Sequence, residues 1–199
     1  EMWDWVLSTA LEQVDAWRSA GYEIPVSVNI AAFQLQQDSF VPKLTRRLAA
    51  YANARQPLLE IEVLETSALE NIGKVAAMMR ACHALGVRFA LDDFGTGYSS
   101  LTYLRHLPAD LLKIDRSFVA GMLDDADDRA IVESVIGLAQ AFQREVIAEG
   151  VETPAHGALL LEMGCEMAQG YAFARPMPGA DMPAWIAQWR NNWAAGQQT

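Results

Sequence analysis

The stretch VRFALDDFGTGYSSLTYLRHLPADLLKID, residues 87–115, decides the fold class of this chain. It holds two short apolar runs, Val87–Leu91 and Asp110–Ile114, and each run is followed by aspartate. Short apolar runs that are separated by a segment long enough for a helix are typical of parallel βαβ units. The stretch therefore predicts two parallel strands of an α/β protein.

The same alternation continues on both sides of this stretch. Strands are predicted at residues 26–30, 58–64, 87–91, 110–114, 145–148 and 165–169. Helices are predicted at residues 3–20, 38–53, 71–85, 127–142, 154–163 and 183–193. A doubly wound sheet could stop at this number of strands, whereas a (β/α)8 barrel needs eight and about 250 residues. Because the sequence opens on a helix, a barrel would lack its first strand or strands here.

Helical periodicity identifies the residues that we expect in the core. In the first helix they are Val6, Leu7, Ala10, Leu11, Val14 and Trp17. In the helix at 127–142 they are Ile131, Val135, Leu138 and Phe142. The tail carries Trp185, Trp189 and Trp193 about one turn apart, and we interpret them as core or subunit contacts.

Composition limits the classes of function. The 199 residues are 52% hydrophobic and carry a net charge of −10, which indicates a folded domain with a sizeable core. Nucleic-acid backbones and anionic membrane surfaces would be repelled, so we expect no DNA partner, although a small phosphorylated ligand held by metal ions is compatible with this charge. Cys82 and Cys165 lack metal-ligand spacing and are predicted to be reduced, and no signal-peptide pattern opens the sequence. Together these features favour a cytoplasmic domain.

Polar side chains gather at or near the carboxyl ends of the predicted strands. They are Asn29, Glu62, Glu65, Asp92, Asp93, Lys113, Asp115, Glu149 and Gln169. In a parallel barrel these ends converge on one face, where barrel enzymes carry their chemistry. In an open sheet they would spread along an edge. The shared placement therefore favours a barrel that lacks its first part, with one site on that face.

Five of these residues offer oxygen ligands: Asn29, Glu62, Asp92, Asp93 and Glu149. Packed carboxylates repel one another unless a cation is bound, and a ligand set without His or Cys suits Mg²⁺ or Mn²⁺. Two such ions form a clamp for in-line displacement at phosphorus. Lys113 would offset negative charge on the phosphoryl group or orient the attacking water.

Taken singly, these residues have simpler interpretations. Asp92-Asp93 is typical of a turn that is closed by an Asx hydrogen bond. Glu149 could cap the following helix, and Lys113 could form a surface ion pair with Asp115. Only their joint placement favours a site. No histidine lies at a predicted strand end and no Ser-His-Asp spacing is present, which disfavours nucleophilic hydrolase chemistry.

The glycine-rich segment at residues 95–100 follows the two aspartates. It lacks the lysine of a phosphate-binding loop. We expect a mobile loop here that leads into a helix capped by Ser99 or Ser100.

Several segments closely resemble the EAL-domain family of cyclic di-GMP phosphodiesterases. The matching segments are VSVNIAAFQL, LEIEVLETS, LDDFGTGYSSLTYLRHLPADLLKIDRSFV, DDRAIV, IAEGVET and AQGYAFARPM, in the family's order between Val26 and Met177. The resemblance implies a modified TIM (β/α)8 barrel that hydrolyses cyclic di-GMP to linear pGpG in bacterial second-messenger signalling. It also implies two Mg²⁺ or Mn²⁺ ions as cofactors.

The resemblance implies a role for each matching position. The implied metal ligands are Asn29, Glu62, Asp92, Asp93 and Glu149, with Asp92 bridging the two ions. The implied catalytic residues are Lys113 beside the attacking water, Glu149, and Gln169 in the network around that water. Glu65 and Glu152 resemble the acidic residues that steady the loop at 94–100, and this loop is similar to the segment that links the metal site to the dimer contact. Asp115 and Arg175 resemble supporting or ligand-side residues.

Two features depart from the family pattern. Leu64 stands where the family has threonine or a similar residue, and the E-x-L-x-R segment of the first strand is absent. In the family, that segment supplies a further metal-binding glutamate and a substrate-binding arginine. We therefore expect residues 1–199 to form a single EAL-type domain that lacks its N-terminal part and is impaired on its own.

Three functional hypotheses follow from this pattern. The first is a metal-dependent phosphodiesterase, which the intact Asp92-Asp93, Lys113 and Glu149 favour. The alternative is a catalytically silent cyclic di-GMP receptor, and the third is a scaffold that binds neither nucleotide nor metal. The resemblance further implies a homodimer and an upstream sensor or GGDEF domain. The parent protein could then be anchored to a membrane through a region outside this sequence.

Overall fold

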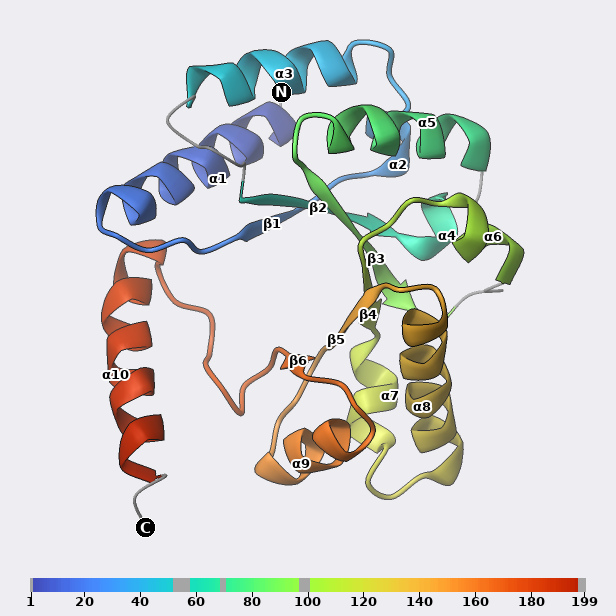
Figure 1. The fold of residues 1–199 in the computed structure, drawn as a ribbon, viewed down its shortest axis with the longest axis vertical. Helices are drawn as coiled ribbons and strands as arrows, with labels where there is room; N and C mark the ends of the chain where they lie inside the picture. Colours follow the sequence, from blue (N-terminus) through green and yellow to red (C-terminus); the bar gives the residue numbers. More distant parts are fainter. Residues whose placement is uncertain (1, 52–57, 69–70, 97–100, 197–199) are drawn as a thin grey trace.

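The computed structural model describes residues 2–51, 58–68, 71–96 and 101–196. At its centre, a parallel sheet of six strands places each strand beside the next one along the chain (Figure 1). The strands are β1 (Val26–Asn29), β2 (Leu59–Leu64), β3 (Arg88–Phe94), β4 (Leu111–Ile114), β5 (Glu145–Ala148) and β6 (Met167–Ala168). This order contains no reversal, which is typical of a (β/α) barrel and excludes the doubly wound alternative. The six predicted parallel strands are confirmed.

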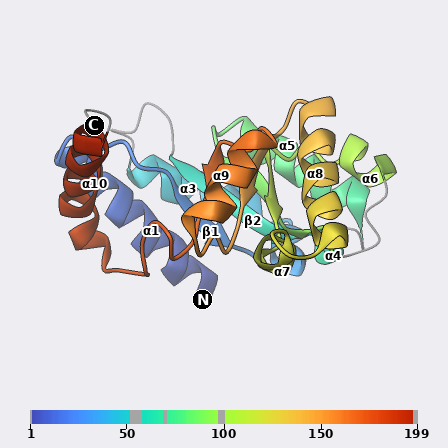
Figure 2. The same ribbon diagram turned by 90° about the horizontal axis from the view of Figure 1, so that it is seen from below.

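Helices connect the strands and cover the outer side of the sheet (Figures 1 and 2). The longer helices are α1 (Met2–Ser19), α3 (Phe40–Ala50), α5 (Ile72–His83), α8 (Ala126–Ala141), α9 (Pro154–Glu162) and α10 (Met182–Gly196). Short helices that the sequence analysis did not predict are α2 (Ala32–Leu35), α4 (Glu65–Ala68), α7 (Arg116–Gly121) and the 3₁₀ turn η1 (Gly179–Asp181). The helix α6 (Leu101–His106) follows the glycine-rich segment. The expected helix end at Asn53 and the expected cap at Ser99 or Ser100 lie outside the described residues.

The hydrophobic core lies between the sheet and these helices. Strand β4 is buried over its whole length, and Phe89 and Leu91 of β3 are fully buried beside it. Such continuous apolar strands are expected in a parallel sheet whose faces are both covered. The core therefore extends across the sheet and ends at the polar side chains of its carboxyl edge.

In two helices the buried residues differ from those that the sequence predicted. In α1 the residues are buried as predicted except that Trp3 replaces Val6, which is only half-buried. In α8 the buried residues are Val132, Val135, Ile136 and Ala139, whereas Ile131, Leu138 and Phe142 are half-buried. Because α8 is apolar on more than one side, its periodicity did not determine which stripe faces the sheet.

Helix caps fix the positions where several strands turn into helices. Asp115 accepts a hydrogen bond from the backbone N–H of Ser117 (2.9 Å) at the start of α7. Thr153 caps α9 by accepting from the N–H of His156 (3.4 Å). The cap of α9 is therefore Thr153, and the interpretation of Glu149 as a helix cap is wrong.

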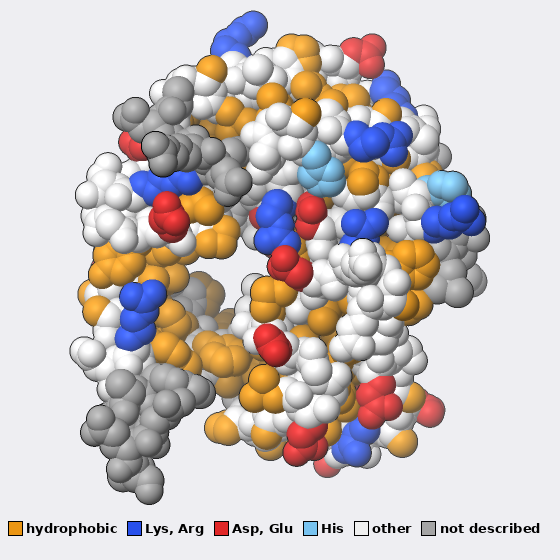
Figure 3. Space-filling view, viewed as in Figure 1, with side chains coloured by type: hydrophobic (Ala, Val, Ile, Leu, Met, Phe, Trp, Pro, Cys, Tyr) orange, Lys and Arg blue, Asp and Glu red, His pale blue; other side chains and the backbone are white. Residues whose placement is uncertain are grey.

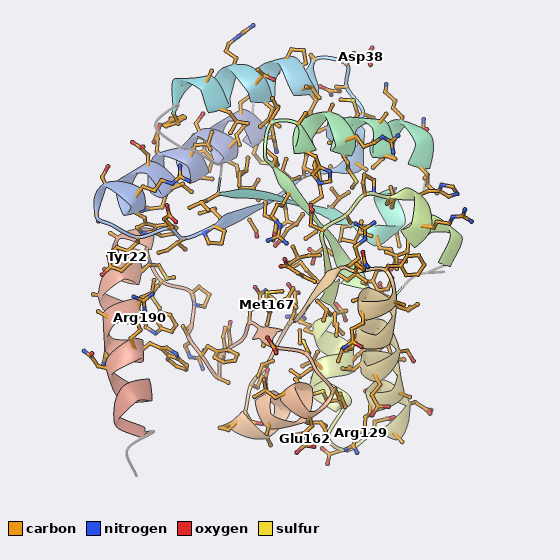
Figure 4. All side chains as sticks on the ribbon, in the orientation of Figure 1. Tyr22, Asp38, Arg129, Glu162, Met167 and Arg190 are labelled. Carbon is orange, nitrogen blue, oxygen red and sulfur yellow. The ribbon has the colours of Figure 1, made fainter. Side chains whose placement is uncertain are left out.

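The C-terminal helix α10 stands beside the end of α1 (Figures 1 and 4). The indole N–H of Trp17 donates to the carbonyl of Gly179 (2.8 Å), and the Tyr22 hydroxyl donates to the carbonyl of Pro183 (3.5 Å). Trp189 is 38% exposed and its ring packs on Trp185 at 5.4 Å between centroids. Trp189 is therefore not a core residue, whereas the other interpretation, a subunit contact, stays a prediction; the side chain of Trp193 lies outside the described part of the chain.

Both cysteines are buried free thiols, as predicted. Burial raises the pKa of the Cys82 thiol to about 12, which keeps it protonated and unreactive at neutral pH. Among the described residues, no helix is both long and apolar enough to cross a lipid bilayer.

Two glycine substitutions test how tightly the segment after β6 packs. A methyl group on Gly170 would lie 2.2 Å from the carbonyl oxygen of Val151, whereas one on Gly137, in the middle of α8, would meet nothing within 4 Å. Gly170→Ala should lower the free energy of unfolding by about 2 kcal/mol or more, because backbone atoms have to move. Gly137→Ala should raise it by about 0.5–1 kcal/mol, because alanine favours the helix. Urea denaturation of the two variants would measure both changes, and equal changes would contradict the close approach at Gly170.

Candidate metal centre at the carboxyl ends of the strands

Lys113 of β4 is the centre of the polar cluster at the carboxyl ends of the strands. Its side chain is only 6% exposed. The ammonium Nζ lies 2.8 Å from Glu62 Oε2, 2.9 Å from Asp92 Oδ1 and 2.6 Å from Glu149 Oε1. Glu62 comes from β2, Asp92 from β3, and Glu149 directly follows β5. One buried cation therefore connects acidic residues from three other strands, and the interpretation of Lys113 as half of a surface pair is wrong.

The electrostatic environment of this cluster favours a charged lysine. Burial opposes the charge of Lys113, but hydrogen bonds to Asp92, Glu149 and Glu62 outweigh it and raise the pKa of the ammonium above its ordinary value. Burial raises the pKa of Glu149, and the hydrogen bond from Lys113 opposes this shift. Burial also raises the pKa of Asp93, and the neighbouring Asp115 and Asp92 add to the shift. Acidic groups are thus more numerous here than the single ammonium can neutralise.

A β-bulge brings both adjacent aspartates to the same site. Leu91 pairs with Leu112 and Phe94 with Ile114, so β3 has one more residue than β4 between these pairs. The extra residue allows Asp93 to take a left-handed conformation, with φ = 53°. In a regular strand, neighbouring side chains point to opposite faces. The bulge re-aims one of the two side chains, so that both can serve one site.

The carboxylates of Asp92, Asp93 and Glu149 form a group that fits a divalent cation. One oxygen atom from each lies within 4.8 Å of the others. All three are oxygen donors of the kind that Mg²⁺ and Mn²⁺ prefer. Together with Glu62 they make four carboxylates at one site, of which three face the single ammonium, and this excess of negative charge favours a bound cation. The donor set and its charge therefore fit the predicted kind of metal site.

Asn29 and Glu62, the other predicted ligands, lie beside this group on the first two strands. Asn29 is exposed at the end of β1, where it is in register with Glu62. The carboxylate of Glu62 faces Lys113 and is not among the three that cluster within 4.8 Å. The structure therefore brings Asp92, Asp93 and Glu149 together directly, and it connects Glu62 to them through Lys113.

The remaining predicted residues surround the cluster. The Gln169 amide donates to Glu149 Oε1 (2.8 Å), and the backbone N–H of Gly95 donates to the buried Glu65 (3.2 Å). Asp115 caps α7; burial opposes its ionisation, but its hydrogen bonds to Ser117 outweigh this and its pKa lies below the ordinary value. The structure therefore attaches Gln169 to the acidic cluster and Glu65 to the first residue of the glycine-rich segment.

A cleft of about 500 Å³ lies next to Glu149 and Gln169. Glu152 and Arg175 line it, and the Arg175 guanidinium lies 4.6 Å from the centre of the Tyr171 ring. Glu152 forms no hydrogen bond or ion pair with the described part of the glycine-rich segment, so its predicted role in steadying that loop stays a prediction. Figure 3 shows acidic side chains beside basic ones near a hollow in the middle of the molecule.

Sequence reasoning missed Arg116 and Tyr171, which also line this cleft. Arg116 directly follows Asp115, and Tyr171 follows Gln169 by two positions. Closeness in sequence to predicted site residues was therefore an available signal. It was weak, because a side chain next to a site residue can point away from the site.

Comparison with known proteins identifies similar chains of named activity. The sequence model of the EAL domain matches residues 1–176. The cyclic di-GMP phosphodiesterase NbdA of Pseudomonas aeruginosa is 40% identical over 188 residues, which are 94% of this chain and 24% of NbdA. This chain spans about a quarter of the length of the curated relatives that it matches first.

Solved structures match the fold. The phosphodiesterase of MucR from Pseudomonas aeruginosa, in complex with cyclic di-GMP, has a TM-score of 0.86 and is 36% identical; the match covers 91% of this chain and 73% of that one. The EAL domain of DcpA from Mycobacterium smegmatis has a TM-score of 0.87 and is 37% identical. This match covers 94% of this chain and 85% of the DcpA domain. These matches confirm the predicted modified barrel.

Thermal unfolding with and without metal tests the acidic cluster as a cation site. Mg²⁺ or Mn²⁺ added to EDTA-treated protein should raise the Tm, because a cation at about a hundred times its Kd adds ~2.7 kcal/mol to the free energy of unfolding. Asp92→Asn should remove most of this shift, since it removes one charged donor. The matched control is Asp124→Asn, which changes an exposed aspartate after α7. This variant should keep the metal-induced rise in Tm. Equal shifts in both variants would exclude Asp92 as a ligand.

Proposed function

The chain belongs to the EAL domain family, and we propose that it hydrolyses one phosphodiester bond of cyclic di-GMP to give linear pGpG. The observation that carries this proposal is the convergence of Asp92, Asp93 and Glu149 beside the buried Lys113. Relatives with this fold are named as cyclic di-GMP phosphodiesterases, and one solved relative holds cyclic di-GMP. The adjoining cleft offers space for the rest of a dinucleotide.

The proposed cofactors are two Mg²⁺ or Mn²⁺ ions. The residues that would hold them are Asp92, Asp93 and Glu149, with Glu62 and Asn29 at the side of the first strands. Bound cations would supply Lewis-acid activation of the phosphoryl oxygens and a nucleophilic hydroxide at neutral pH. Oxygen donors from successive strand ends are a suitable ligand set for such ions.

Lys113 has two proposed roles. It holds Glu62, Asp92 and Glu149 in fixed positions, because an oxygen of each lies within 2.9 Å of the same ammonium. Its charge also lies where it opposes negative charge that develops on a phosphoryl group at the acidic cluster. Both roles need the ammonium charged, and its raised pKa keeps it charged at neutral pH.

Gln169 and Glu65 are proposed to position other groups. Gln169 donates to the same oxygen of Glu149 that faces Lys113, so it fixes the orientation of this carboxylate. Glu65 accepts from the N–H of Gly95, two residues after Asp93, and thereby fixes the start of the glycine-rich segment. Asp115 connects Asp93 to the start of α7, and Arg175 and Glu152 are proposed to face the ligand from the cleft.

We further propose that the domain acts as a homodimer within a longer signalling protein. The curated relatives are about four times as long as the matched region, and MucR is named as a bifunctional diguanylate cyclase and phosphodiesterase. An upstream sensor or GGDEF domain is the corresponding proposal for this protein.

Chromatography of cyclic di-GMP after incubation with Mg²⁺ and the domain extended upstream through its expected first strand tests the activity, because residues 1–199 on their own are expected to be impaired. The expected product is pGpG, and Asp92→Asn should lower kcat at least about 1,000-fold, because the cations that would stabilise the transition state lose a charged ligand. Asp124→Asn is again the matched control and should keep the activity of the wild type. Uncut cyclic di-GMP that nevertheless raises the Tm would support the receptor alternative instead.

Gln169→Ala tests the orientation of Glu149. Loss of the amide donor should lower kcat about tenfold and change KM little, because the carboxylate stays in place but loses a fixed orientation. Gln37→Ala, at an exposed position between α2 and α3, should have no effect. A change in KM alone would contradict the proposed role, because it would place Gln169 in ground-state binding of the substrate.

A further inference from the structure

The cleft beside the acidic cluster holds two arginines from separate parts of the chain. Arg116 is the first residue of α7, and Arg175 follows β6. Both side chains are exposed, and both line the cleft together with Glu149 and Gln169. One end of the cleft is therefore the acidic cluster, and its wall carries two guanidinium groups.

Among the described residues, neither guanidinium group lies within ion-pair distance of a carboxylate, although Arg116 attracts its neighbour Asp115 at longer range. Arg175 instead lies on the ring of Tyr171. By contrast, Arg88 pairs with Glu145 at 2.8 Å and Lys74 with Asp38 at 3.2 Å. In a chain with a net charge of −10, two arginines in one cleft that form no close ion pair are available for an anionic ligand.

Arg116 is held close to the acidic cluster by the helix cap that precedes it and by its packing on Gly150. Its predecessor Asp115 caps α7 by accepting from the backbone N–H of Ser117 at 2.9 Å. Its Cβ packs so closely on Gly150, the residue after Glu149, that a methyl group at Gly150 would come within 2.7 Å of it. Gly150 also has φ = 73°, a conformation that other residues rarely adopt. The position of Arg116 relative to Glu149 is therefore fixed by the fold.

We propose that Arg116 is a substrate-specificity residue that binds the second, uncleaved phosphate of the cyclic dinucleotide. The inference rests on the proposed function, which places the phosphate to be cleaved at the acidic cluster. A cyclic dinucleotide carries a second phosphate on the opposite side of its ring, and that phosphate then extends into the cleft. A guanidinium is suited to it because its planar donors can bind two phosphate oxygens at once. The acidic residues nearby would repel this phosphate in the absence of Arg116 and Arg175.

Steady-state kinetics of Arg116→Ala and Arg116→Lys test this role. Arg116→Ala should raise the KM for cyclic di-GMP about tenfold and change kcat less than about threefold, since a charge-assisted contact to an unreacting phosphate is lost. The KM of Arg116→Lys should lie between those of the wild type and Arg116→Ala, because lysine keeps the charge but lacks the planar donors. The KM of Arg116→Ala should also depend less on salt concentration than that of the wild type. Arg80→Ala, an exposed arginine on α5, is the matched control and should leave KM unchanged.

GMP as an inhibitor separates recognition of the second phosphate from a structural role. GMP has one phosphate, which we expect at the acidic cluster, so its inhibition constant should be the same in wild type and Arg116→Ala. An unchanged KM for cyclic di-GMP would overturn the inference. An equal loss of affinity for GMP, or a loss of the Mg²⁺-induced Tm shift, would also overturn it, because Arg116 would then only support the fold of the site.

Equilibrium binding of cyclic di-GMP to the same variants distinguishes a failure of this inference from a failure of the proposed function. If wild type binds without cleavage, a tenfold weaker binding by Arg116→Ala supports Arg116 as a phosphate ligand although the enzyme proposal has failed. If wild type cleaves and Arg116→Ala has an unchanged KM, only the role of Arg116 is wrong. If wild type neither binds nor cleaves, both are wrong.

Discussion

The buried ammonium of Lys113 is the interaction on which the site depends. Three carboxylates from other strands face it at 2.6–2.9 Å, at a depth where like charges repel one another strongly. Without a cation at this position, these three carboxylates would repel one another at the ends of their strands. Removal of one partner from such a buried ion-pair network is costly, because the other charges stay buried without compensation. The lysine therefore has a structural role before any metal or substrate binds, and its proposed catalytic role uses the same charge.

The acidic cluster also depends on an irregularity of the sheet. A regular β3 would point Asp92 and Asp93 to opposite faces, and the second aspartate would be lost to the site. The bulge against β4 and the positive φ of Asp93 remove this restriction at the cost of local backbone strain. The strain lies at the position where the proposed chemistry needs two adjacent carboxylates, and the buried strands on either side hold it in place.

The acidic cluster and the cleft beside it have complementary charges. The cluster has an excess of carboxylates, which suits cations, whereas the cleft presents the guanidinium groups of Arg116 and Arg175. A ligand with two phosphates can use both, one through cations and one through arginine. This division of charge is consistent with a small phosphorylated ligand, although the chain as a whole is acidic.

The sequence by itself determined the fold class and most of the site. The alternation of apolar runs predicted six parallel strands, and the polar residues after these runs predicted that Glu62, Asp92, Lys113 and Glu149 would meet, because the carboxyl ends of parallel strands share one edge. It did not determine which stripe of α8 is buried, the bulge at Asp93, the cap of α9 at Thr153 or the presence of Arg116 in the cleft. These features depend on how strands and helices pack against one another. Such contacts join residues far apart in the chain, and local periodicity carries no information about them.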